Sequence, residues 1–257
     1  MFDKNIFLAG LVAFTASAGT ASAATATIGI LSWGAGAGAN KADAIAARDT
    51  FIGTQGPIIA ETFEGFTACP GATCDSGTIN SNVGTFTGFG GHPANPGGSQ
   101  VDPRGEIVVR TNTPNPFRRF DVEGGSNWLD SNDLNGIQWD IPGASSLPAL
   151  RKLAFFLTDV DDVGSVNFEI SADGTMFDSI LTGLQGRQTN GTLNLVTLSF
   201  SESVSDLQIR MTAGVGDGFG IDGIRVAAVP LPAAGLMLLG AIGGLGAMRM
   251  RKRKMAS

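Results

Sequence analysis

Short apolar runs separated by Gly, Asn, Asp and Pro follow one another from residue 58 to residue 228. Runs of roughly four to eight apolar and β-branched residues between such turn residues are typical of antiparallel strands. The pattern predicts ten strands: Ile58–Phe63, Gly84–Phe89, Glu106–Arg110, Gly136–Trp139, Leu153–Thr158, Val166–Ser171, Phe177–Leu181, Leu193–Phe200, Leu207–Thr212 and Gly220–Ala227.

Three of these runs indicate which strand faces are buried. Val166–Ser171 and Leu207–Thr212 alternate apolar with polar residues, which predicts strands with one buried and one solvated face. Leu153–Leu157 is apolar at every position and is therefore expected to be a central strand. Asp173 and Gly174 lie between two runs and predict a hairpin turn.

One segment has a different pattern. Asn40–Ile52 carries good helix formers with apolar residues at near-helical spacing, which predicts a short helix. Asn40 is the expected N-cap and Gly53 the expected end. Ala26–Trp33 before it is expected to be an edge strand or part of a flexible lead-in. Together these elements predict a mainly β fold, an antiparallel two-sheet sandwich that is jelly-roll-like, with one short N-terminal helix.

The N-terminal residues predict export. Lys4 supplies a positive region, Ile6–Phe14 an apolar core too short for a membrane helix, and Ala21–Ala23 a small-x-small cleavage site. These are the parts of a secretory signal peptide. We therefore expect a signal peptide over 1–23, a lead-in and helix over 24–57, a β-sandwich ectodomain over 58–228, and a C-terminal segment over 229–254.

The C-terminal segment has three parts. It opens with Val229, Pro230, Leu231, Pro232 and Ala233, runs without charge to Met248, and ends in the basic residues Arg249, Arg251, Lys252, Arg253 and Lys254. An uncharged run of about 20 residues, rising about 1.5 Å per residue, matches a bilayer core of roughly 30 Å. The basic cluster would hold its end on the cytoplasmic side. The segment therefore predicts a transmembrane helix.

This order resembles the VPLPA variant of the PEP-CTERM family of sorting signals, over about the last tenth of the chain. The resemblance implies that an exosortase-type membrane protease recognises the tail, cuts near the motif, and releases or transfers the exported protein. It implies tethering to the inner membrane through the C-terminal helix before processing, and a cell-surface or extracellular location afterwards. A simple tail anchor is the alternative interpretation.

Charge and cysteine content limit the partners and the covalent chemistry. Without the signal peptide and the C-terminal basic cluster, the chain keeps 11 basic and 22 acidic residues. Such an acidic body argues against nucleic acid as a partner. Cys69 and Cys74 are the two cysteines, and in an exported chain this close pair predicts a disulfide that pins a small loop.

The densest group of carboxylates is Asp159, Asp161 and Asp162. Carboxylates this close repel one another unless they are solvated or bridged by a hard cation such as Ca²⁺, which takes roughly six to eight oxygen ligands. The spacing fails as an EF-hand, because Val163 and Ile170 stand where that loop needs ligands. An acidic, solvent-facing loop and a structural calcium site both remain open.

A second acidic pair comes from the two ends of the sandwich. Thr62–Phe66 and Ile221–Ile224 resemble the first and last strands of MAM-type and carbohydrate-binding jelly rolls. The resemblance implies that these strands are neighbours and that Glu64 and Asp222 are tentative calcium ligands. Gly223 stands where those folds usually have a second Asp. From the residues themselves, Gly223 is expected to make a β-bulge that aims Asp222 sideways, toward loop backbone or toward a metal with Glu64.

Catalytic motifs are scarce. His92 is the sole histidine, no serine lies in a Gly-x-Ser-x-Gly elbow, and no phosphate-binding glycine motif is present. Two carboxylates suffice for a glycosidase, but nothing singles out a pair. Trp139 is expected in the core, whereas Trp128, beside Asn127, is the better candidate for an exposed sugar-stacking residue.

These observations predict an exported, non-catalytic cell-surface or extracellular-matrix protein. The resemblance implies processing by an exosortase-type system and an association with exopolysaccharide in a biofilm. The alternative is a secreted carbohydrate-active enzyme, a glycosidase or lyase on a jelly-roll scaffold.

Overall fold

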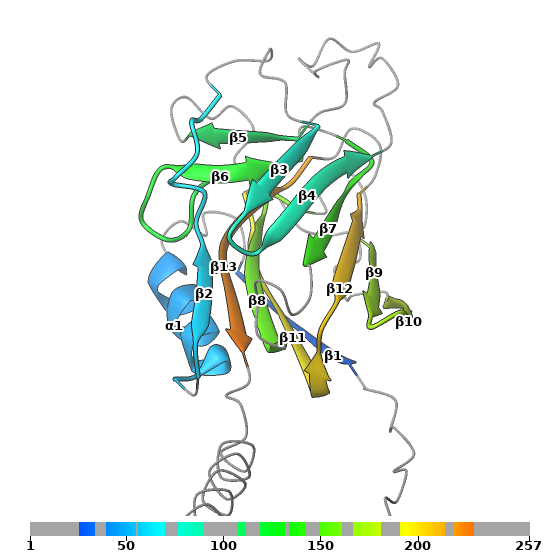
Figure 1. Cartoon of the computed structure of the whole chain (residues 1–257). Coiled ribbons are helices and arrows are strands. Elements are labelled where there is room, and N and C mark those ends of the chain that lie inside the picture. Colours follow the sequence, from blue (N-terminus) through cyan, green and yellow to red (C-terminus); the bar gives the residue numbers. More distant parts are fainter. Residues whose placement is uncertain are drawn as a thin grey trace, which may run out of the picture.

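The computed structural model describes residues 26–33, 40–54, 56–69, 77–89, 107–111, 119–131, 134–141, 150–160, 167–180, 191–213 and 218–228. Over these residues two antiparallel sheets pack face to face and one helix lies against one of them (Figure 1). The predicted mainly β, antiparallel two-sheet sandwich with one helix is confirmed.

Seven strands form what we call the inner sheet. Across the sheet the order is β1 (Ala26–Trp33), β11 (Leu193–Val204), β8 (Leu150–Thr158), β13 (Gly220–Ala228), β6 (Asn127–Asp130) and β5 (Val108–Thr111), and β2 (Ile58–Glu61) also pairs with β13. β2 pairs with residues 224–227 of β13, whereas β6 pairs with residues 220–221. The early strand β2 therefore lies beside the last strand, as the resemblance to jelly rolls implied.

Six strands form what we call the outer sheet. Their order is β10 (Thr175–Ile180), β9 (Asn167–Ala172), β12 (Leu207–Thr212), β7 (Gly136–Ile141), β4 (Gly84–Phe89) and β3 (Thr78–Ser81). From β6 onward the chain crosses between the two sheets at almost every connection, and only the β9–β10 hairpin stays in one sheet. This alternation makes the sandwich jelly-roll-like.

A row of aromatic rings fills the space between the sheets. The Phe86 ring stacks on Trp139 with centroids 4.9 Å apart, and Trp139 meets the Phe155 ring edge-on at 5.6 Å. Trp139 is buried, and its Nε1–H donates to the backbone oxygen of Val83 at 3.0 Å. The prediction that Trp139 belongs to the core is confirmed.

The predicted central strand is β8, which is buried on both faces. Leu153, Phe155 and Leu157 point into the core between the sheets. Ala154 and Phe156 belong to a second apolar cluster, which the helix covers. Residues 153–157 are apolar throughout because β8 belongs to the middle of three layers: the outer sheet covers one of its faces and the helix covers the other.

The helix α1 (Lys41–Ile52) packs on the inner sheet through one narrow face. Ala44, Arg48 and Ile52, spaced four residues apart, are its buried residues. Asn40 occupies the N-cap position but its side chain makes no capping hydrogen bond, while Gly53 ends the helix with φ 73° and donates its N–H to Asp49 O at 2.9 Å. The predicted helix bounds are confirmed.

The bulge predicted at Gly223 is present in β13. Pairing with β8 shifts register between Asp222 and Arg225, and Gly223 has φ 58°, in the left-handed region that favours glycine. A side-chain Cβ at Gly223 would lie 2.6 Å from the Phe156 ring. The predicted hairpin turn is also present, with φ 48° at Asp173 and 75° at Gly174 between β9 and β10.

Several strand bounds differ from those predicted. The strands β3 and β6 were not predicted, because each has four residues and a polar composition, TINS and NWLD, with no apolar run. β11 continues four residues past Phe200 to Val204, through a polar stretch. The predicted edge strand Ala26–Trp33 is β1, paired with β11 over its full length.

Both predicted targeting segments, residues 1–23 and 229–254, lie outside the described residues, and their assignment stays a prediction. In the part of the chain that the structure describes, no helix is long and apolar enough to cross a membrane.

Gly223→Ala is expected to lower the free energy of unfolding by about 2–4 kcal/mol. Left-handed backbone costs an L residue about 1–2 kcal/mol, and the new methyl group would overlap the Phe156 ring. Gly174→Ala shares the left-handed backbone but faces open space, so we expect a loss of about 1 kcal/mol.

Urea denaturation of the two variants, with Gly65→Ala as a control in open space, measures the difference. Equal losses for Gly223→Ala and Gly174→Ala would show that the bulge accommodates a side chain and would contradict the packing argument.

Candidate functional site

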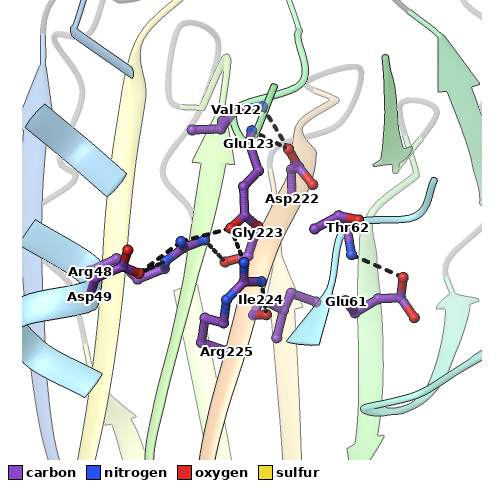
Figure 2. A network of polar contacts seen from close by, with 10 residues as sticks. All are labelled: Arg48, Asp49, Glu61, Thr62, Val122, Glu123, Asp222, Gly223, Ile224 and Arg225. Carbon is purple, nitrogen blue, oxygen red and sulfur yellow. Dashed lines mark hydrogen bonds and ion pairs between the residues drawn. The ribbon is translucent and has the colours of Figure 1, made fainter. Parts of the chain in front are cut away.

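Asp222, at the bulge of β13, binds a backbone segment that leads from the β5–β6 connection into the first residue of β6. We call residues 119–127 the 119–127 segment. Figure 2 shows the Asp222 carboxylate pointing at this segment. Asp222 Oδ2 accepts hydrogen bonds from the backbone N–H groups of Val122 at 2.6 Å and Glu123 at 3.2 Å. The sequence left two roles open for Asp222, bonding to loop backbone or binding a metal. In the structure its side chain is bonded to loop backbone.

Glu64 binds the other end of the same segment. Its Oε1 accepts the backbone N–H groups of Ser126 at 2.8 Å and Asn127 at 2.7 Å. A side chain at Gly125 would overlap the Glu64 carboxylate, so glycine is required for this close approach. Glu64 and Asp222 therefore bind the same segment, and the groups they bind in the structure are peptide N–H donors.

An arginine from the helix completes this arrangement. Arg48 is 1% exposed, and it donates Nη1 to the backbone oxygen of Gly223 at 2.9 Å and Nη2 to Glu123 at 2.8 Å (Figure 2). Glu123 also pairs with Arg225. Burial and the charge of Arg48 lower the pKa of Arg225 to about 10. Two cations thus share one carboxylate beside the bulge, and they fix the helix against β13.

Asp222 is the most electrostatically perturbed group of the site. It is 1% exposed, and its Oδ1 has no hydrogen-bond partner among the described residues. Burial raises the pKa of Asp222 to about 7, the N–H groups of Val122 and Gly223 oppose the rise, and the charges of Asp121 and Glu64 add to it. The carboxyl is therefore close to half protonated at neutral pH.

Asp159 lies one residue beyond the end of β8 and has φ 57°. Its Oδ1 accepts the backbone N–H of Gly191 at 2.7 Å, and its Oδ2 lies 3.7 Å from Arg119 Nε. Arg119 also binds Asp130 at 2.7 Å, and Asp130 binds Arg110 at 2.6 Å. Asp159 is buried, so it does not belong to a solvent-facing loop.

Of the five predicted metal ligands the structure describes Glu64, Asp159 and Asp222, and it does not bring Asp159 and Asp222 together. Register puts Asp222 opposite Phe156, three positions along β8 from Asp159, which is a separation of about 10 Å along the strand. No group of three His, Cys, Asp or Glu side chains able to hold a metal occurs in the described ranges. Asp161 and Asp162 lie outside those ranges, and the calcium site stays a prediction.

Two other predicted residues can be placed. Trp128 is 1% exposed, so the prediction of an exposed sugar-stacking residue there is wrong. It was made because Asn and Asp flank Trp128, but all four residues of β6 are buried. Cys69 is buried as well, and its N–H donates to Val109 O at 2.8 Å. Cys74 lies outside the described residues, and the disulfide stays a prediction.

Sequence reasoning missed the arginines that join these carboxylates. One signal was available, since Ala44, Arg48 and Ile52 fall on one helix face and put a cation in an apolar stripe. The partner Glu123 lies 75 residues away in a segment without periodicity, and no local pattern could have identified it.

A second polar surface lies on the uncovered face of the outer sheet. Each of its strands β12, β7, β4 and β9 alternates buried apolar residues with more exposed polar ones. We call the outward-facing set the polar face; its members are Thr78, Asn80, Thr85, Thr87, Phe89, Gln138, Asp140, Asn167, Glu169, Ser171, Gln208, Arg210 and Thr212.

One end of the polar face is hollowed. The hollow has a volume of about 270 Å³ and is lined by Asp140, Ile141, Ser171, Gly174, Asp206, Leu207 and Gln208. It lies where the β9–β10 turn and the start of β12 meet β7. Polar side chains with two apolar neighbours in a depression are a suitable setting for a hydroxylated ligand.

No family model matches the chain, and no curated protein matches it. Among solved structures it is similar to the K2 cleaved adhesin domain of Lys-gingipain, with a TM-score of 0.41, 12% identity, and coverage of 66% of this chain and 99% of that one. It is also similar to the CBM22-1 xylan-binding domain of Paenibacillus barcinonensis Xyn10C, with a TM-score of 0.36, 12% identity, and coverage of 69% and 99%. Likenesses of this size carry no conclusion about function.

Stability is expected to fall as pH rises from about 4 to about 7 through the Asp222 carboxyl. The folded state keeps the proton up to a pKa of about 7, while the unfolded chain loses it near the ordinary value of 3.8. Each pH unit in this window is worth about 1.4 kcal/mol, so the wild-type protein should lose about 2–3 kcal/mol between pH 5 and pH 8.

Urea denaturation at pH 5, 6, 7 and 8 tests this, with Asp222→Asn as the matched variant. The amide keeps an oxygen acceptor for Val122 and Glu123 but does not ionise. We expect the variant to lack this pH dependence and to be more stable than the wild-type protein at pH 8. Parallel pH profiles for the two proteins would contradict the assignment.

Calcium is expected to raise the melting temperature of residues 24–228, if Asp159, Asp161 and Asp162 hold it as predicted. A ligand that binds only the folded state adds about 2.7 kcal/mol at a hundredfold excess over its Kd. The measurement is the shift between excess EDTA and millimolar Ca²⁺, in the wild-type protein and in Asp161→Asn and Asp222→Asn.

The shift itself is the readout, because Asp222 is bonded to loop backbone and its variants change stability without a metal. A shift lost in Asp161→Asn and kept in Asp222→Asn places the ion after β8. No shift in the wild-type protein contradicts the prediction.

Proposed function

We propose that this chain is an exported cell-surface or extracellular-matrix protein, processed at its C-terminal tail by an exosortase-type protease. Its β-sandwich is non-catalytic and associates with extracellular polysaccharide. Tethering to the inner membrane precedes processing, and the mature protein is at the cell surface or outside the cell.

The observation that carries the proposal is where the described fold ends relative to the sorting motif. β13 ends at Ala228, and the motif Val229–Ala233 begins at the next residue. β13 is an interior strand, paired with β8 on one side and with β2 and β6 on the other. Cleavage at the motif would therefore remove the tail and leave every described strand complete, as release of a folded domain requires.

A non-catalytic role is supported by the bonding of five carboxylates, of which all but the exposed Glu64 are buried. Glu61 accepts backbone N–H groups from Thr62, Phe63 and Asn82, and Asp130 is paired with two arginines. Glu64, Asp159 and Asp222 are likewise bonded to backbone. These carboxylates stabilise loops and would have to leave their partners to act as acid, base or nucleophile.

Processing is tested by expressing the full chain in a bacterium that has an exosortase and in the same strain without it. We expect a mature species lacking the tail in the surface or matrix fraction of the first strain, and a membrane-bound full-length species in the second. Pro230→Ala with Pro232→Ala should block maturation, since both lie in the motif.

The matched control is Arg253→Lys, which keeps the basic charge at the tail. A full-length protein in every fraction of both strains would contradict processing. A mature species found only in the periplasm, and absent from surface and matrix, would contradict the proposed location.

A further inference from the structure

We infer that the polar face of the outer sheet, centred on Gln138, Asp140 and Gln208, is a binding face for a neutral, hydroxyl-rich polysaccharide chain. The inference rests on the proposed association with extracellular polysaccharide. It goes beyond that function in naming the ligand class and the residues that would bind it.

The layering of the molecule leaves this sheet face uncovered. The helix and residues such as Val122 cover one side of the inner sheet, and the outer sheet covers the other (Figure 1). The outer sheet buries only the side that carries Trp139, Ile209 and Phe168. No described helix or strand lies over its other side, where Gln208 and Arg210 are exposed.

Register aligns the polar side chains of this face into rows that run across the strands. One row, following the pairings from β9 to β3, is Ser171, Gln208, Asp140, Thr85 and Asn80. The next row is Glu169, Arg210, Gln138, Thr87 and Thr78. At about 4.8 Å between neighbouring strands, each row spans roughly 19 Å. Such a row offers hydroxyl, amide and carboxylate groups in series to an extended chain.

Hydrogen bonds hold the three central side chains of the polar face in place without a ligand. Gln208 Nε2 donates to Asp140 Oδ1 at 2.7 Å, and Gln138 Nε2 donates to Asp140 Oδ2 at 3.0 Å. These bonds use the amide nitrogens, so the amide oxygens of both glutamines remain available as acceptors. The carboxylate and amide oxygens can accept hydrogen bonds from sugar hydroxyls, and the remaining amide N–H groups can donate to sugar oxygens. Because the side chains are held in place beforehand, binding costs less conformational entropy.

The hollow next to this centre adds a depression about the size of a single small ligand unit. Its volume of about 270 Å³ is just below the range of roughly 300–1,000 Å³ typical of small-molecule sites. The two turns at its rim are fixed by Asp173, whose Oδ1 accepts the N–H groups of Ser205 and Asp206 at 2.8 Å each. Ile141 and Leu207 line the hollow from the core side and are buried, so the groups open to a ligand there are the polar ones of Asp140, Ser171, Asp206 and Gln208.

The charges of the face favour a neutral ligand over an acidic one. Arg210 lies 3.8 Å from Glu169, and its guanidinium stacks over the Phe89 ring at 4.1 Å. Asp140 therefore leaves the face with a small negative balance. A polyanionic chain would meet carboxylates without surplus cations, and like charges repel. Phe89 is the one ring among the described residues of this face, and Arg210 already occupies one side of it, so hydrogen bonding must provide most of the recognition.

Affinity electrophoresis of the full chain tests the inference. The chain is held in a zwitterionic detergent without sugar headgroups, in gels that contain xylan, galactomannan, dextran, mixed-linkage β-glucan or the acidic polysaccharide alginate. We expect retardation by at least one of the four neutral polymers. Gln138→Ala and Gln208→Ala should each weaken it about tenfold, the equivalent of about 1.4 kcal/mol.

Glu202→Ala is the matched control, because Glu202 is an exposed strand residue of β11 in the inner sheet. It should bind as the wild-type protein does, and unchanged melting temperatures should show that all variants are folded. No retardation by any neutral polymer, or retardation by alginate alone, overturns the inference. So does retardation that the two glutamine variants leave unchanged.

Reducing ends are measured in the same mixtures. Their release by the wild-type protein but not by Asp140→Asn would overturn the non-catalytic part of the proposal. Failure of the inference is distinguishable from failure of the proposed function, because maturation and fractionation of the chain are measured without any added polysaccharide.

Discussion

A buried carboxylate at a strand bulge organises one side of this protein. At Gly223 the last strand changes register against β8, and the side chain of the preceding residue, Asp222, reaches the 119–127 segment. A buried carboxylate with one unpartnered oxygen is costly unless its other bonds are good. The two backbone N–H groups that bond to it offset part of that cost, and burial still leaves the pKa of Asp222 raised to about 7. Helix position, loop position and the end of the last strand therefore depend on one another.

Polar groups have different roles on the two sides of the molecule. On the helix side, Asp222 and Glu64 are bonded to backbone and Glu123 to arginine, so these polar groups hold the fold together. The outer sheet needs no such groups, because its alternating strands bury one face in the aromatic core and leave the other to solvent. Its polar side chains Gln138, Asp140 and Gln208 bond to one another on that open side. A surface of that kind can change its side chains to suit a ligand while the sandwich is maintained elsewhere.

Local patterns predicted those elements whose cause is local. The unbroken apolar run of β8 follows from burial on two faces, and the Asp173–Gly174 turn and the Gly223 bulge follow from left-handed backbone that glycine and aspartate tolerate. Prediction failed where the cause is a partner far along the chain. Trp128 has polar neighbours in sequence yet is buried, because β6 lies between β5 and β13. Likewise, nothing near Arg48 reveals that its carboxylate partner is Glu123.

The same distinction explains why the polar face could not be recognised in the sequence. Gln138, Asp140 and Gln208 lie on two strands whose alternation is that of any half-buried strand. These three residues form one cluster because the strand register sets Gln208 opposite Asp140. The cluster is open to a ligand because no described element covers that side of the sheet. The proposed sorting motif, by contrast, is linear, and its resemblance to a known signal lies in the order of its residues. The two features belong together physically, because a tail that begins directly after an interior strand can be removed without disturbing the face. Delivery and binding can therefore be encoded separately in one chain.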